Sequence, residues 1–185
     1  MVSTAEEWDE RYRQVDRMWS GNPNESLIYA VQALALSPGK AADVGCGEGA
    51  DALWLSDAGW QVTAFDPSAV AVSRARAADA DGAVEWRVCG IEDFPDSPTY
   101  DLVTAMYPVL PPTQEACDQL RRLLAPGGVL LFVHHHGSFD CLTPAMVAEL
   151  SDARVLINET RSRHVTHGTG SHHHDDHIVA VTFPH

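Results

Sequence analysis

A glycine-rich segment between a strand-like run and a helix-like run limits the fold of this chain more than any other feature. It reads Asp43-Val-Gly-Cys-Gly-Glu-Gly49 and follows the short apolar run of residues 40–44. Glycines let the backbone turn tightly and approach a ligand closely, and the N-terminus of the following helix offers unpaired amides. A strand, a glycine-rich turn and a helix in this order predict the first unit of a doubly wound α/β sheet.

Strand-like and helix-like segments alternate along the rest of the chain. Short apolar runs predict strands over residues 40–44, 60–65, 84–89, 100–106 and 129–134. Helices are expected over 4–18, over 24–36 with Asn24 as N-cap, over 49–58, from Ser68 to about Asp79, from Thr113 to a stop at Pro126-Gly127-Gly128, and after Thr143-Pro144. The last two strands, 153–162 and 177–183, have no helix between them. The sequence therefore predicts an α/β fold with a doubly wound, Rossmann-like, seven-stranded and mostly parallel sheet, helices on both faces and an antiparallel C-terminal edge hairpin.

The domain organisation follows from length and from the absence of any repeat or linker. The 185 residues suffice for one domain and are few for two. We expect a single domain over 1–185, with 1–36 as an N-terminal helical cover and 37–185 as the Rossmann-like core. No apolar run approaches the roughly 20 residues that span a bilayer, and the acidic first residues do not suit a signal peptide. The four widely spaced cysteines argue against a zinc ribbon or a disulfide framework and favour a cytoplasmic location.

The net charge of −14 limits the partners. Nucleic acids and anionic membranes normally require a basic surface, and this chain has one lysine, Lys40. A small molecule or a cationic substrate is therefore the expected partner, although an acidic surface also serves solubility alone. The sequence leaves open whether the chain is a monomer or a homodimer.

An acid follows the glycine segment at the end of the second predicted strand. A carboxylate at this position, Asp66, can accept hydrogen bonds from both hydroxyls of a ribose. The run from Gly45 to Ala50 also satisfies the looser dinucleotide pattern G-x-G-x-x-A. The glycines and Asp66 alone therefore do not separate a dinucleotide site from other nucleoside sites.

Two features favour a cofactor that ends in an amino acid over a dinucleotide. Asp43 lies two residues before Gly45, where a carboxylate would repel a pyrophosphate but would pair with the amino group of a methionine moiety. Because Lys40 lies inside a predicted strand, the chain has no Tyr-x-x-x-Lys pair of the kind that dehydrogenases use. An NAD-dependent oxidoreductase remains the alternative.

The segment 42–56, followed by 59–66, resembles class I S-adenosylmethionine-dependent methyltransferases. Within this class the chain is similar to the branch of tellurite-resistance and thiopurine methyltransferases. Three further pieces support that branch: Trp8-Asp-Glu-Arg-Tyr12 with Trp19 beyond it, Leu110-Pro-Pro112, and the segment 124–132. The resemblance covers nearly the whole chain and implies S-adenosylmethionine as the cofactor.

The resemblance also implies roles for the residues around the glycine segment. The methionine part of the cofactor would be held by Asp43 and by the loop residues Gly45, Cys46, Gly47 and Gly49. The ribose would be held by Asp66.

The adenine pocket implied by the resemblance follows the third predicted strand. Pro67 would pack near the adenine, and Ile91 would supply apolar contact and a backbone amide. The family often has an acid where this chain has Gly90, and Glu92 or Asp93 could replace that acid.

Aromatic residues and the tip of the fourth predicted strand complete the implied site. Tyr12 and Trp19 would fold over the cofactor, since an aromatic face attracts a sulfonium, although they also fit the apolar face of a helix and its loop. Met106 and Tyr107 would line the site near the reacting methyl group.

The chemistry expected at such a site depends mainly on alignment and desolvation. A thiol or a chalcogen oxyanion needs little general base, whereas an amine or an alcohol needs more. His135, within the run 134–136 after the fifth predicted strand, aligns with a histidine often seen in similar sequences and could orient or deprotonate the substrate.

A second group of histidines crowds the predicted C-terminal hairpin. Imidazoles and carboxylates together can bind zinc, nickel or copper, but the spacing here matches no closed metal site. This group comprises His164, His167, His172, His173, His174 and His177, with Asp175 and Asp176. We expect no metal in the active site, and keep a non-catalytic cofactor-binding or metal-binding protein as a further alternative.

Overall fold

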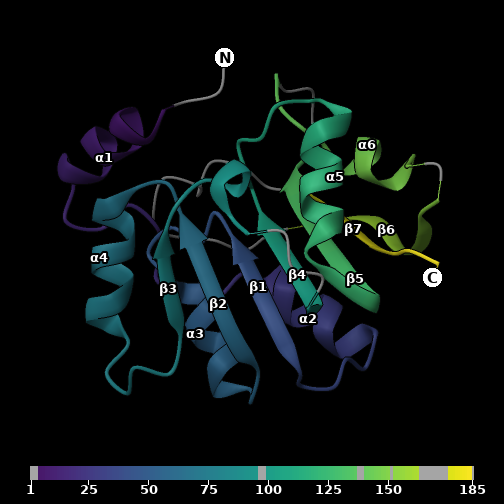
Figure 1. Cartoon of the computed structure of the whole chain (residues 1–185), viewed down its shortest axis with the longest axis horizontal. Coiled ribbons are helices and arrows are strands. Elements are labelled where there is room, and N and C mark those ends of the chain that lie inside the picture. Colours follow the sequence, from purple (N-terminus) through teal and green to yellow (C-terminus); the bar gives the residue numbers. More distant parts are fainter. Residues whose placement is uncertain (1–3, 96–98, 137–139, 151, 163–174, 185) are drawn as a thin grey trace.

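The computed structural model describes residues 4–95, 99–136, 140–150, 152–162 and 175–184. These residues form one seven-stranded sheet in the order β3-β2-β1-β4-β5-β7-β6, with helices on both faces (Figure 1). The predicted α/β fold is confirmed, including its antiparallel edge. No helix in the described part of the chain is long and apolar enough to cross a membrane.

Five strands of the sheet are parallel. Their order places β1 next to both β2 and β4, so the chain reverses its winding direction at β1. The bounds are β1 Lys40–Val44, β2 Gln61–Asp66, β3 Glu85–Val88, β4 Tyr100–Met106 and β5 Leu124–His135. Ligands in such sheets bind beyond the carboxyl ends of the strands at the switch point, which here lies between β1 and β4.

The C-terminal strands form the antiparallel edge. The strand β7 Asp175–Thr182 inserts between β5 and β6 Arg154–Ser162 and pairs antiparallel with both. The register places Asp176 directly opposite His135, at the carboxyl end of β5.

Two apolar layers hold the helices against the sheet. One layer joins β-strand residues to α2 Glu25–Ala33, α3 Ala50–Asp57 and α4 Ala69–Ala78. The opposite layer contains η1 Ile91–Asp93, α5 Gln114–Arg122 and α6 Pro144–Ala148. The helix α1 Ala5–Arg13 lies outside the sheet layers and packs on α4 (Figure 1).

Several expected boundaries differ in the structure. The first helix ends at Arg13 and not near residue 18, because the following residues turn back toward the glycine loop. The expected stop at Pro126-Gly127-Gly128 lies inside β5, as a register shift opposite the start of β4. Asn24 occupies the N-cap position of α2 but makes no capping bond, because its side chain donates to Asp51 instead.

Candidate active site

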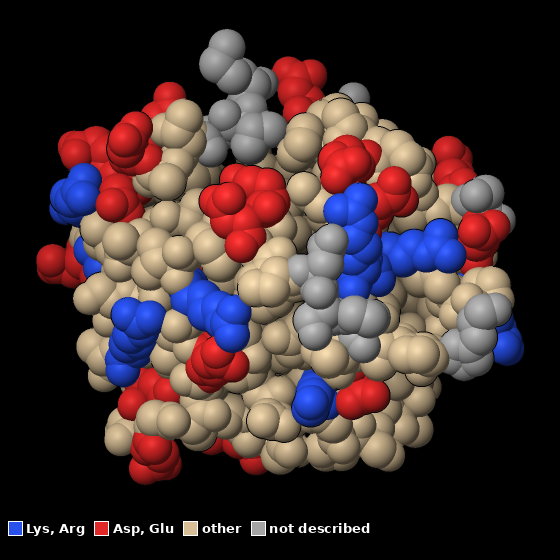
Figure 2. All heavy atoms as spheres, viewed as in Figure 1, with Lys and Arg blue, Asp and Glu red and all other residues tan. Residues whose placement is uncertain are grey.

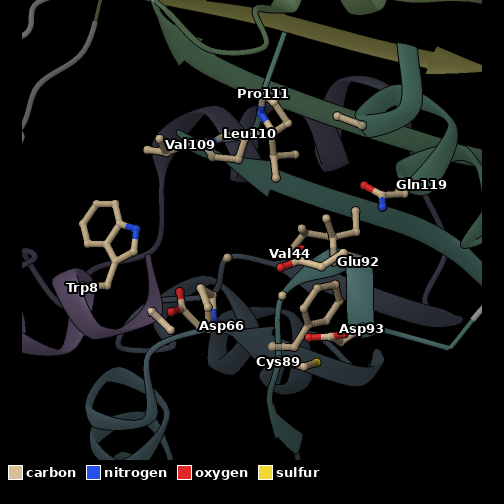
Figure 3. A pocket seen from close by; sticks show the side chains of 18 of the residues that line it. Trp8, Val44, Asp66, Cys89, Glu92, Asp93, Val109, Leu110, Pro111 and Gln119 are labelled. Carbon is tan, nitrogen blue, oxygen red and sulfur yellow. The ribbon is translucent and has the colours of Figure 1, made fainter. Parts of the chain in front are cut away.

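Two adjoining cavities open at the carboxyl ends of β1, β2 and β4. The first cavity has a volume of about 660 Å³ and the second about 290 Å³. Tyr12, Gly45, Tyr107 and Val109 line both. Figure 3 shows the first cavity, with Trp8 of α1 on the left, Leu110 and Pro111 above, and Asp66 and Cys89 below. Every residue that the sequence singled out for cofactor binding or catalysis lines one or both cavities.

The glycine loop between β1 and α3 forms the shared wall of the cavities. Gly45 has a φ of +70°, and a β carbon placed on it would meet no atom within 4 Å. The space beside Gly45 is therefore open to a ligand. Gly49 has a φ of +86°, and a β carbon there would lie 2.5 Å from the ring of Trp86, so this glycine lets α3 and β3 approach.

Asp66 lies at the end of β2, at the border of the first cavity. Its carboxylate accepts hydrogen bonds from the amides of Gly47 (3.0 Å) and Ser68 (2.8 Å). Burial raises the pKa of this carboxyl, and the two amide bonds act against that rise. The carboxylate thus fixes the glycine loop and borders the space where a ribose would lie.

Asp43 lies at the end of β1 and borders the second cavity. Its Oδ1 accepts a hydrogen bond from the Thr104 hydroxyl at 2.8 Å, whereas its buried Oδ2 has no hydrogen-bond partner among the described residues. Burial and the nearby carboxylates of Asp51 and Asp66 raise the pKa of Asp43 to about 8. A buried carboxylate oxygen without a donor fits an ammonium group that would enter the second cavity.

Asp51, in the first turn of α3, also lines the second cavity and was not predicted from the sequence. Asp51 accepts hydrogen bonds from the backbone amide (2.7 Å) and the side chain (2.5 Å) of Asn24. These bonds tie the start of α2 to the start of α3. The acid in the first turn of the helix was visible in the sequence, but its partner 27 residues earlier was not.

The end of β3 and η1 form one side of the first cavity. A β carbon placed on Gly90 would collide with the carboxylate of Glu92, so the Glu92 side chain already fills the space of a Gly90 side chain. Ile91 is buried beside it, and Pro67 lies on the facing loop of the same cavity. Of the two acids that the sequence offered as replacements, Glu92 has its carboxylate beside Gly90.

The aromatic cover lies over the glycine loop. The indole Nε1 of Trp19 donates to the hydroxyl of Tyr12 at 2.9 Å. A β carbon placed on Gly47 would lie 3.1 Å from both of these side chains. Tyr12 and Trp19 therefore roof the second cavity.

A charged pair that the sequence did not reveal holds this cover in place. Glu48 accepts hydrogen bonds from the backbone amides of Met18 and Trp19 and from Arg74 of α4 at 2.9 Å. Arg74 also donates to the backbone oxygens of Tyr12 and Val15. The glycine loop, α4 and the cover are thus joined through one glutamate and one arginine.

The tips of β4 and β5 carry the candidate catalytic residues. Met106 and Tyr107 follow each other at the end of β4, and the ring of Tyr107 stacks on that of His135 with centroids 4.5 Å apart. The Tyr107 hydroxyl donates to Asp176 Oδ2 at 2.6 Å, and His135 Nδ1 lies 3.5 Å from Asp176 Oδ1. Asp176 was noted only among the hairpin histidines, since the expected strand began one residue later.

The other histidines divide into described and undescribed residues. His134 lines the second cavity, and its Nε2 lies 3.6 Å from the Cys141 sulfur. His177 pairs with Asn158 at 2.7 Å. The described residues contain no group of three or more ligands that could hold a metal ion. His164, His167, His172, His173 and His174 lie outside the described residues.

Comparison with protein families identifies the central part of the chain. Residues 41–128, from β1 into β5, match the model of a methyltransferase domain. This segment contains the glycine loop, Asp66 and the tip of β4.

Two curated relatives each match more than half of the chain. One is a ribosomal RNA small subunit methyltransferase C of Alcanivorax borkumensis, 38% identical over 58% of this chain and 36% of that protein. The other is a ubiquinone biosynthesis O-methyltransferase of Alkalilimnicola ehrlichii, 34% identical over 57% of this chain and 46% of that protein. The chain spans less than half the length of either relative.

A solved structure shares the whole fold. The N-methyltransferase NodS of Bradyrhizobium japonicum, solved with S-adenosylhomocysteine, superposes with a TM-score of 0.74 at 17% identity, covering 99% of this chain and 100% of that one. At this identity the likeness concerns the fold alone. The chain thus has a segment, residues 41–128, that matches a methyltransferase domain, and a fold like that of NodS.

Proposed function

We propose that this chain transfers a methyl group from S-adenosylmethionine to a small-molecule acceptor, and that residues 1–185 act as one catalytic unit. The observation that carries the proposal is the open space beside Gly45, bordered by the buried Asp43 and Asp66. This arrangement offers one carboxylate to an ammonium group and another to a ribose.

Each part of the cofactor has residues that suit it. Asp43 and the loop residues Gly45, Cys46, Gly47 and Gly49 would hold the amino-acid end, and Asp66 the ribose hydroxyls. The adenine would lie between Pro67 and Ile91, with Glu92 accepting from its amino group.

The remaining lining residues suit the reacting end of the cofactor. Tyr12 and Trp19 roof the second cavity, and Met106 borders it at the tip of β4. The bound cofactor would supply an electrophilic methyl group on a cationic sulfur. Tyr12 and Trp19 would exclude water from it and offer aromatic faces to the positive charge.

A small acceptor is favoured over a nucleic acid by the charge of the cavity rim. Acidic side chains border the hollow between α1 and α5 (Figure 2), where a phosphate backbone would be repelled. The finer resemblance to the tellurite-resistance and thiopurine branch belongs to this proposal, since it rests on the cover and on Leu110-Pro-Pro112. This resemblance makes thiols, chalcogen oxyanions and amines the acceptor classes to compare. We also propose that the enzyme acts in the cytoplasm.

The proposal is tested by methyl transfer from S-adenosylmethionine with a labelled methyl group. The purified protein is incubated with panels of small thiols, chalcogen oxyanions and amines, and with an RNA fragment as comparison. We expect label in at least one small molecule and none in RNA. Transfer to RNA alone would contradict the small-molecule assignment, and no transfer to any acceptor would contradict the activity.

Asp66→Ala supplies the matching binding test. Loss of the ribose hydrogen bonds, together with a loosened Gly47 amide, should weaken S-adenosylhomocysteine binding by about 100-fold, since each bond to a charged group contributes about 1.5–3 kcal/mol. Isothermal titration calorimetry measures the change, and Asp81→Ala, an exposed acid near the far end of α4, is the control. Equal affinity of Asp66→Ala and wild type would remove Asp66 from the cofactor site.

A further inference from the structure

A buried carboxylate gathers three polar side chains behind the second cavity. Asp176 of β7 is 2% exposed. Its Oδ2 accepts hydrogen bonds from the Ser26 hydroxyl of α2 (2.9 Å) and the Tyr107 hydroxyl (2.6 Å), and its Oδ1 lies 3.5 Å from His135 Nδ1. Methyl transfer driven by proximity alone does not require this cluster, so its presence calls for a separate role.

The cluster fixes the orientation of His135. The imidazole is stacked on the ring of Tyr107 with an interplanar angle of 29°, and Tyr107 itself has a φ of +53° that non-glycine residues rarely adopt. Its backbone amide donates to Val133 at 2.7 Å. His135 Nδ1 lies within ion-pair distance (3.5 Å) of Asp176 Oδ1, and the imidazole ring lines the second cavity.

Apart from two histidines, the ionisable side chains of Lys, Arg, Asp and Glu type that line the two cavities are all acidic. The described lining residues include neither lysine nor arginine but seven carboxylates: Asp43, Glu48, Asp51, Asp66, Glu92, Asp93 and Glu115. Glu48 is paired with Arg74 and Glu115 with Arg122, and three others are assigned to the cofactor above. An anionic acceptor would enter this region without a cation to pair with, whereas an ammonium ion would be attracted.

We propose that the acceptor is a small primary or secondary amine that arrives as an ammonium ion, and that His135, positioned by Asp176, removes its proton before methylation. This inference rests on the proposed methyltransferase function. It narrows the three acceptor classes to one and assigns Asp176 as a positioning residue.

The proposed step balances in protons and electrons. The ammonium ion gives one proton to the His135 imidazole, and the Asp176 carboxylate, with Oδ1 3.5 Å from Nδ1, stabilises the resulting imidazolium by its charge. The freed nitrogen lone pair forms the N–C bond while the C–S bond breaks and its electron pair stays on sulfur. The product is a methylated ammonium ion, and the proton on His135 leaves to solvent.

The first test compares two probes that share a phenylethyl group and carry opposite charges. The protein is saturated with S-adenosylhomocysteine and titrated calorimetrically with 2-phenylethylamine and, separately, with 3-phenylpropionate; the aromatic ring suits the apolar wall of Trp8, Val109 and Leu110. We expect the amine to bind at least tenfold more tightly. Equal or tighter binding of the carboxylate, or no binding of the amine, would overturn the inference. Failure of S-adenosylhomocysteine itself to bind would instead overturn the proposed function.

The second test separates positioning by Asp176 from a structural role. Asp176→Asn should lower kcat for methylation of 2-phenylethylamine about 10- to 100-fold near neutral pH with little change in KM, and this deficit should shrink at high pH, where the amine loses its proton without a base. Asp176→Glu should restore part of the rate, and Asp175→Asn, on the exposed neighbour, should leave the rate unchanged.

His135→Gln keeps the test decisive if Asp176 variants fail to fold. It should show the same deficit near neutral pH, shrinking at high pH, while retaining S-adenosylhomocysteine binding within a fewfold of wild type. A wild-type rate and pH profile in His135→Gln, or in folded Asp176→Asn, would overturn the assignment.

Discussion

At the scale of single residues, three buried aspartates near the glycine loop differ in their hydrogen-bond partners. Asp66 already receives two backbone amides, whereas Asp43 has one hydroxyl donor and a buried second oxygen. Asp51 has both its oxygens bonded to Asn24. The residue type alone therefore does not predict the role of each aspartate, whereas its hydrogen-bond partners do.

The raised pKa of Asp43 predicts a pH-dependent affinity. Without ligand the folded protein keeps a proton on Asp43 that the unfolded chain has lost, so this group's contribution to stability falls as pH rises from 3.8 toward about 8. An ammonium ligand binds the ionised form, so binding near neutral pH should release a proton. Affinity for S-adenosylhomocysteine should therefore rise by up to about tenfold per pH unit from about pH 6 to about pH 7.5.

Calorimetry in buffers of different ionisation enthalpy measures this proton release. Asp43→Asn keeps the shape of the side chain and should bind more weakly with little pH dependence. Proton uptake on binding by the wild type would contradict the role given to Asp43.

Gly45→Ala tests the open space beside the loop against a matched glycine. Gly45 and Gly82 have φ values of +70° and +62°, and a β carbon at either would meet no atom within 4 Å. Both alanine variants should lose about 1 kcal/mol of stability from left-handed strain. Only Gly45→Ala should lose S-adenosylhomocysteine binding, by tenfold or more, because its methyl group enters the cofactor space.

Thermal unfolding and calorimetry on the two variants check this prediction. Unchanged binding by Gly45→Ala would show that the ligand does not approach the loop.

At the scale of elements, the N-terminal cover is attached by few bonds. Asp9 of α1 accepts from the Ser68 hydroxyl (2.6 Å) and from the Val70 amide (3.1 Å), at the start of α4. The next attachment is the Glu48–Arg74 pair. The cover is thus fixed at both its ends to elements that also border the cofactor site.

Arg74→Ala should loosen this cover. The change leaves Glu48, whose side chain is 9% exposed, without its cation and removes two bonds to backbone oxygens, a loss of about 2 kcal/mol. Trypsin cleavage after Arg13 and Arg17, followed by mass spectrometry, should become several-fold faster. Arg87→Ala, which breaks an exposed pair with Glu85, is the control and should leave the cleavage rate unchanged. Equal cleavage in both variants would contradict the role of Arg74.

Gly49→Ala tests the contact between α3 and β3. A methyl group there would overlap the Trp86 ring and would also adopt an unfavourable backbone conformation. The free energy of unfolding should fall by about 3 kcal/mol, measured by urea denaturation, against about 1 kcal/mol for Gly82→Ala. If Gly49→Ala lowers the free energy of unfolding no more than Gly82→Ala does, the contact between α3 and Trp86 of β3 accommodates the methyl group without cost.

At the scale of the whole molecule, the sheet was predictable and its long-range contacts were not. The predicted strands 40–44 and 100–106 match β1 and β4 because apolar runs bounded by turn residues constrain strand ends closely. The Pro126-Gly127-Gly128 segment was predicted to stop a helix, but it forms a bulge within β5. Only the pairing with β4 reveals that.

The candidate site was predictable where it follows from strand ends. Asp43, Asp66 and Tyr107 all lie at carboxyl ends of parallel strands, which the order of elements brings together. The bond from Ser26 to Asp176 joins residues 150 positions apart, and the pairs Glu48–Arg74 and Asn24–Asp51 depend on how α4 and α2 pack. Local sequence patterns contain no information about such pairs.

The central claim, a site for the methyl donor at the carboxyl ends of β1 and β2, is tested most directly by one calorimetric comparison. The purified wild-type protein is titrated with S-adenosylhomocysteine and, under the same conditions, with NADH. We expect saturable binding of S-adenosylhomocysteine at about one site per chain and no measurable heat from NADH. Binding of NADH with no binding of S-adenosylhomocysteine by folded protein would contradict it.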